Sequence, residues 1–153
     1  MPLGSILNQK APDFTLKGLD NKEVKLSQFK DKTVILDFFG TFSTTSKKQV
    51  AVMEKLYKKY KEQGLVVLGI TSEKDRPKVQ KFVTDNKLTF TVLPDGVKSL
   101  KNYKVTQLPM LFFIKNGVVS VLLMGPNTYT ETKLDAEIAK YFPAASASAS
   151  TKQ

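Results

Sequence analysis

The sequence contains no cysteine, no histidine and no tryptophan, and its one arginine is Arg76. Without cysteine the chain can form neither a disulfide nor a thiolate nucleophile. Without histidine it lacks a common zinc ligand and the usual base that activates a serine nucleophile. We therefore expect no metal site, no cofactor and no Ser-His hydrolase chemistry.

The chain also lacks a long hydrophobic run. No stretch of about 18 consecutive apolar residues occurs, so we expect no membrane-spanning segment. Residues 1–7 have neither a basic start nor a long apolar stretch, and therefore do not look like a signal peptide. Two locations stay open: the cytoplasm, or an extracytoplasmic compartment reached by removal of a targeting segment.

The formal net charge of +10 comes almost wholly from lysine. Lysine carries a compact, hydrated charge and lacks the planar fork with which arginine reads phosphate and guanine edges. We therefore expect no specific nucleic-acid binding. A well-solvated surface is the simplest interpretation, and weak contact with anionic membranes or acidic partners is the alternative.

Hydrophobic periodicity predicts one α/β domain in this chain of 153 residues. An N-terminal arm is expected over residues 1–10, the domain over 11–142 and a disordered Ala/Ser-rich tail over 143–153. A β-hairpin is expected within residues 13–26. The predicted strands then cover 33–39, 65–70, 90–93, 110–114 and 118–124, and the predicted helices 47–60, 75–86, 97–103 and 130–141.

The corner over residues 40–48 joins the buried strand before it to the amphipathic helix after it. It contains two serines with two residues between them, Ser43 and Ser46, with Phe42 before the first. This corner resembles that of thioredoxin-like proteins, which carry a reactive Cys-x-x-Cys pair at these two positions. Within that superfamily, residues 11–142 look most like the TlpA/ResA-type thiol-disulfide oxidoreductases.

The resemblance implies a thioredoxin-like fold, in which helices flank a central mixed β-sheet and an N-terminal β-hairpin is added. It implies that Asp37 is the buried acid that handles the proton of the second cysteine. It also implies that Pro109 is a cis-proline facing the site beside Ser43 and Ser46. The residues expected to contact substrate are Phe42, Thr44, Thr45, Leu108 and Met110.

Members with both cysteines reduce disulfides of client proteins and hold extended client segments beside the site, and we expect a monomer. The resemblance implies an extracytoplasmic or periplasmic location. With serine at both positions we expect a redox-inactive chain, since no oxygen analogue of disulfide exchange exists. Two origins stay open: a deliberate double Cys-to-Ser replacement, or a natural lineage that lost its thiols. A thiol-free binding module for protein partners or anionic surfaces is the alternative function.

Overall fold

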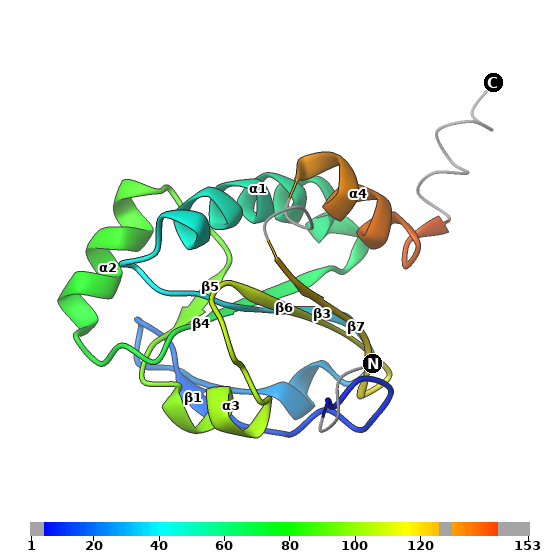
Figure 1. Ribbon diagram of the computed structural model, residues 1–153, viewed down its shortest axis with the longest axis horizontal. Helices are drawn as coiled ribbons and strands as arrows, with labels where there is room; N and C mark the ends of the chain where they lie inside the picture. The colour runs from blue at the N-terminus through cyan, green and yellow to red at the C-terminus, as the bar shows by residue number, and fades with distance from the viewer. Residues whose placement is uncertain (1–4, 126–129, 144–153) are drawn as a thin grey trace.

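The structure, a computed structural model, describes residues 5–125 and 130–143 (Figure 1). Apart from residue 143, the predicted tail lies outside the described residues, as do residues 1–4 of the predicted arm. The remainder forms a sheet covered on both faces, which is the predicted α/β arrangement.

The central sheet has five strands in the order β5-β4-β3-β6-β7. β3, β4 and β5 are parallel to one another, β6 runs antiparallel to β3, and β7 runs antiparallel to β6, with which it forms a hairpin. The sheet is therefore mixed, as predicted. Its strands are β3 (Thr33–Phe38), β4 (Val66–Ile70), β5 (Thr91–Leu93), β6 (Met110–Lys115) and β7 (Val118–Met124).

Helices cover both faces of this sheet (Figure 1). α1 (Thr44–Tyr60), α2 (Arg76–Asp85) and α4 (Glu131–Ala139) contribute buried residues to one core, which we call the helix-side core. α3 (Val97–Asn102) lies on the opposite face with the N-terminal hairpin, over what we call the hairpin-side core. α1 begins three residues earlier than predicted because Ser43, not Ser46, is its N-cap.

The alternation of β3 produces these two cores. Successive side chains of a strand point to opposite faces, so Val34, Leu36 and Phe38 enter the hairpin-side core, whereas Ile35 enters the helix-side core. Asp37 has the same parity as Ile35 and therefore faces α1. The central strand thus directs a carboxyl group into an apolar layer.

The predicted N-terminal hairpin is present as β1 (Thr15–Lys17) and β2 (Glu23–Lys25), which pair antiparallel. A 3-10 helix, η1 (Leu26–Phe29), follows it, and a second, η2 (Lys61–Gln63), extends the end of α1. The described part of the predicted arm lies along β7: the N–H of Asn8 donates to the carbonyl of Val119 (2.7 Å).

Candidate functional site

Two serine hydroxyls occupy the first turn of α1. The Oγ of Ser43 accepts a hydrogen bond from the N–H of Ser46 (3.0 Å) and so caps the helix. The Oγ of Ser46 accepts one from the N–H of Gly40 (3.2 Å). Ser43 is half-buried and Ser46 is fully buried. The corner therefore presents one hydroxyl toward the surface and holds the other beneath it.

The electrostatics of this turn favour an anion at position 43. The helix N-terminus carries unpaired N–H groups and a partial positive charge. The first turn contains no acidic residue, and Lys47 and Lys48 are exposed just after it. Such surroundings lower the pKa of a thiol and stabilise its thiolate. A serine hydroxyl gains only the capping hydrogen bond from the same geometry.

Asp37 lies fully buried under α1. Among the described residues, neither of its carboxyl oxygens has a hydrogen-bond partner. Burial raises the pKa of Asp37 from 3.8 to about 7, although the nearby amide of Gln49 lowers it in part. The side chain can therefore accept or release a proton near neutral pH, which is what acid-base work requires.

Gln49 is a residue of the site that the sequence analysis did not assign. Its side chain is buried, and neither the oxygen nor the nitrogen of its amide makes a hydrogen bond of normal geometry within the described ranges. The signal available in the sequence was its spacing, because residues three apart share one helix face and Gln49 follows Ser46 by three.

An apolar surface adjoins the serines. Phe42 is 71% exposed, yet its ring lies over Gly40. A Cβ atom at Gly40 would lie 2.7 Å from two ring carbons of Phe42 and 3.2 Å from Cδ1 of Leu108. A side chain at position 40 would therefore displace the exposed ring of Phe42, and Phe42 and Leu108 both lie close to Gly40. The peptide bond between Leu108 and Pro109 is cis, as predicted.

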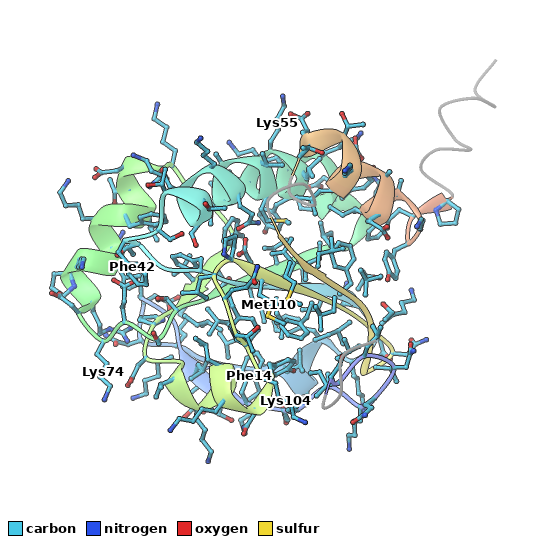
Figure 2. The ribbon with its side chains drawn as sticks, in the orientation of Figure 1. Phe14, Phe42, Lys55, Lys74, Lys104 and Met110 are labelled. Carbon is cyan, nitrogen blue, oxygen red and sulfur yellow. The ribbon has the colours of Figure 1, made fainter. Side chains whose placement is uncertain are left out.

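The remaining predicted contact residues divide into two groups. Thr44 and Thr45 are exposed in the first turn of α1. Met110 is only 3% exposed and belongs to the hairpin-side core. In Figure 2 Met110 is labelled over the centre of the molecule, and Phe42 to its left, near α2. Because β6 directs Met110 inward, its side chain is not available to a client, contrary to our expectation.

Within residues 5–125 and 130–143, no helix combines the length and the hydropathy that a bilayer crossing requires. The same ranges contain no group of three or more acidic side chains placed to hold a metal ion.

The sequence matches known proteins over most of its length. Residues 7–121 match the AhpC/TSA family. The chain is 32% identical over 139 residues to the thiol-disulfide oxidoreductase ResA of Bacillus cereus, an alignment that covers 90% of this chain and 79% of that protein. It is 36% identical over 129 residues to ResA of Geobacillus kaustophilus, with coverage of 83% and 72%.

Solved structures agree with this assignment. A putative thiol:disulfide interchange protein DsbE from Chlorobium tepidum superposes with a TM-score of 0.78 at 26% identity, covering 89% of this chain and 99% of that one. A putative protein disulfide isomerase from Bacteroides thetaiotaomicron gives a TM-score of 0.80 at 22% identity, covering 90% and 89%, and supports the fold alone. The chain therefore belongs to the TlpA/ResA-type thiol-disulfide oxidoreductases of the thioredoxin-like superfamily.

Proposed function

We propose that this chain is a redox-inactive form of a thiol-disulfide oxidoreductase, with Ser43 and Ser46 in the places of an attacking and a resolving cysteine. The observation that carries the proposal is the asymmetry of the two hydroxyls. The outer one caps α1, and the inner one is fully buried and bonded to the N–H of Gly40. The side chain at position 43 can therefore contact a client, whereas the side chain at position 46 can contact only the one at position 43.

With thiols restored, the thiolate at position 43 would attack one sulfur of a client disulfide. A mixed disulfide would form, and the other client sulfur would leave as a thiolate. The thiol at position 46 would then attack the sulfur at position 43, release the second client thiolate and leave an internal disulfide. The client gains two electrons and the protein dithiol loses them.

Asp37 would take the proton of the inner thiol in the second step. It lies on β3 facing α1, and its pKa of about 7 lets it exchange a proton near neutral pH. A carboxyl without a hydrogen-bond partner costs free energy in an apolar core. Its presence beneath α1, beside Gln49, supports a former or potential role in thiol chemistry.

In the present chain only the binding half of this cycle is left. An extended client segment would lie beside Leu108 and Pro109 and contact Phe42, Thr44 and Thr45, in the manner of a strand added to an exposed backbone edge. Serine at both positions permits this contact and prevents electron transfer. An extracytoplasmic location belongs to the same proposal and rests on the family resemblance.

The double variant S43C/S46C tests the proposal. We expect it to catalyse the reduction of insulin disulfides by a dithiol, and the single variant S43C to accumulate a mixed disulfide with the client because nothing resolves it. The matched control is T45C/K48C, which has the same spacing two residues further along α1 and should show no turnover. A folded S43C/S46C protein without turnover and with ordinary thiol pKa values would contradict the proposal.

The serines themselves have two candidate origins. We propose that they result from a double Cys-to-Ser replacement, because both differences are the same exchange of sulfur for oxygen while Asp37 and Pro109 are kept. Cysteine codons at positions 43 and 46 in the encoding gene would support this origin. Serine codons there would indicate a natural lineage that keeps the binding surface without thiols.

The second candidate function is a basic binding module, favoured by the exposed Lys47 and Lys48 beside the uncompensated start of α1. Such a module would bind acidic partners or anionic vesicles with an affinity that falls as ionic strength rises. Its binding would be insensitive to S43C/S46C and would be lost in K47E/K48E.

A further inference from the structure

Glu73, in the loop between β4 and α2, reaches across to the corner that precedes α1. Its Oε2 accepts a hydrogen bond from the N–H of Thr41 (2.7 Å), and its Oε1 accepts one from the hydroxyl of Thr41 (2.5 Å). Both donors of one residue are therefore satisfied by the two oxygens of one carboxylate, 32 residues away in the chain.

Other residues of the same region hold the carboxylate and the backbone of Glu73 in place. The hydroxyl of Thr71 donates to Oε2 (3.1 Å), Nζ of Lys78 lies 3.7 Å from Oε1, and the N–H of Asp95 donates to the main-chain carbonyl of Glu73 (2.8 Å). Burial alone would raise the pKa of Glu73, but the hydrogen bonds from Thr41 and Thr71, with Lys78, lower it. Glu73 is thus an ionised, immobilised acceptor at neutral pH.

Glu73 is not needed to form the turn at the corner. The N–H of Ser43 donates to the carbonyl of Gly40 (3.1 Å), and Ser43 caps α1 independently. The backbone hydrogen bond of the turn already closes it. The two hydrogen bonds from Thr41 to Glu73 therefore fix the orientation of Thr41 and do not create the turn.

The residue that gains this orientation is Phe42. It lies between Thr41 and Ser43, and its ring is 71% exposed while lying over Gly40 beside Leu108. Because the ring is largely exposed, the backbone that Glu73 holds at Thr41 limits the directions in which the rotamers of Phe42 can point. A ring held in one direction loses less conformational entropy when a partner covers it.

We propose that Glu73 is a positioning residue for client binding, which acts by fixing Thr41 so that Phe42 and Leu108 form a preorganised apolar platform. This inference rests on the proposed function and specifies its client. The platform fits an extended segment with an apolar side chain next to its disulfide. Glu73 itself does not touch the client.

The absence of tryptophan permits a test that needs no thiol. F42W places a single indole on the platform of the present chain. We expect E73A to lower the fluorescence anisotropy of this indole and T41V, which removes only the hydroxyl bond, to lower it less. E73Q keeps one acceptor oxygen and should restore part of the signal. Equal anisotropy of the indole in F42W and in F42W/E73A would overturn the proposal.

The second arm uses S43C/S46C and compares two substrates. With E73A added, we expect KM for a protein disulfide such as insulin to rise about tenfold and kcat to change less than about twofold. This pattern is expected when a substitution weakens the binding of substrate and of transition state equally. The rate with hydroxyethyl disulfide, which is too small to cover the platform, should be unchanged. Equal losses on both substrates would contradict a positioning role.

The matched control is D135A. Asp135 is also a partly exposed carboxylate that accepts side-chain hydrogen bonds, from Lys59 and Tyr60, but at the far end of α1. We expect D135A to lower Tm without changing KM; a rise in KM equal to that of E73A would overturn the proposal. If S43C/S46C reduces neither substrate, the proposed function fails, whereas the anisotropy still decides whether Glu73 orients position 42.

Discussion

Two carboxylates are buried in the same helix-side layer, and their surroundings differ completely. Glu54, on α1, accepts hydrogen bonds from the N–H of Thr89 (2.8 Å), the N–H of Phe90 (3.4 Å) and the hydroxyl of Thr89 (2.5 Å). Lys58 lies 3.7 Å from it at the surface. Glu54 therefore joins α1 to the segment that leads into β5, and its burial is compensated.

Asp37, on β3, has no such partners. Both of its oxygens lack hydrogen bonds within the described part of the chain, and so does the amide of Gln49 that faces it. Holding this carboxyl with a pKa of about 7 instead of 3.8 corresponds to about 4 kcal/mol when it is ionised. The comparison indicates that Glu54 stabilises the fold, whereas Asp37 destabilises it when ionised, a cost that the proposed role of Asp37 in thiol chemistry would explain.

Glu54→Ala should have the largest effect on stability. The substitution leaves the N–H groups of Thr89 and Phe90 without their acceptor and opens a cavity, so we expect the free energy of unfolding to fall by about 4 kcal/mol. Urea denaturation measures this loss, and Glu54→Gln, which keeps one acceptor, should lose less. A loss below about 1 kcal/mol would show that Glu54 is not the structural member of the pair.

Asp37→Asn should raise the free energy of unfolding, whereas Glu54→Ala lowers it. The unfolded chain releases the Asp37 proton near pH 4 and the folded chain near pH 7, so between these values the folded state binds more protons. Stability therefore falls by about 1.4 kcal/mol per pH unit as the pH rises through this window. The variant lacks this slope. We expect it to be about 3 kcal/mol more stable at pH 6 and nearly unchanged at pH 4. Parallel pH curves would contradict the assignment.

Gln49→Leu should have a smaller effect. It removes a buried amide without a hydrogen bond, so we expect a gain of about 1 kcal/mol in the free energy of unfolding. Without the amide that lowers it, the pKa of Asp37 should rise further, and the decline of stability with pH should extend to higher pH. Urea denaturation across the pH range measures both effects. If the stability of Gln49→Leu stopped falling at a lower pH than that of the unsubstituted protein, this expectation would be wrong.

Lys58→Ala should have the smallest effect. The ammonium is exposed and lies 3.7 Å from Glu54, and ion pairs of this kind contribute less than about 1 kcal/mol. We expect a change in unfolding free energy below about 0.5 kcal/mol. A loss as large as that of Glu54→Ala would assign the role of Glu54 to the ion pair instead of to Thr89 and Phe90.

Local patterns predicted most of the fold. Alternation with period 2 located the strands and apolar spacing near 3.6 located the helices, because both depend only on neighbours along the chain. The helices predicted over 75–86 and 130–141 start as expected, with Asp75 and Thr130 as the N-caps of α2 and α4. The start of α1 was placed three residues late because its apolar spacing begins only at Val50, whereas Ser43 caps the helix.

The site was predicted only where a motif marked it. Ser43, Ser46, Asp37 and Pro109 stand at positions that the family pattern identifies, and their roles stay predictions. Met110 was assigned as a contact residue because it adjoins Pro109 in the sequence. The side of the sheet that it faces depends on how β6 registers with β3, where Phe38 pairs with Met110.

By itself, the sequence determined the α/β class of the fold and the absence of thiols, since these follow from periodicity along the chain and from composition. Its resemblance to a known family, and not periodicity, marked positions 43 and 46. Only the tertiary structure decided that Asp37 and Gln49 face one another without hydrogen bonds and that Glu73 holds Thr41. Residues far apart in the chain meet only after strands and helices pack. Which polar groups then find partners is a property of the assembled core.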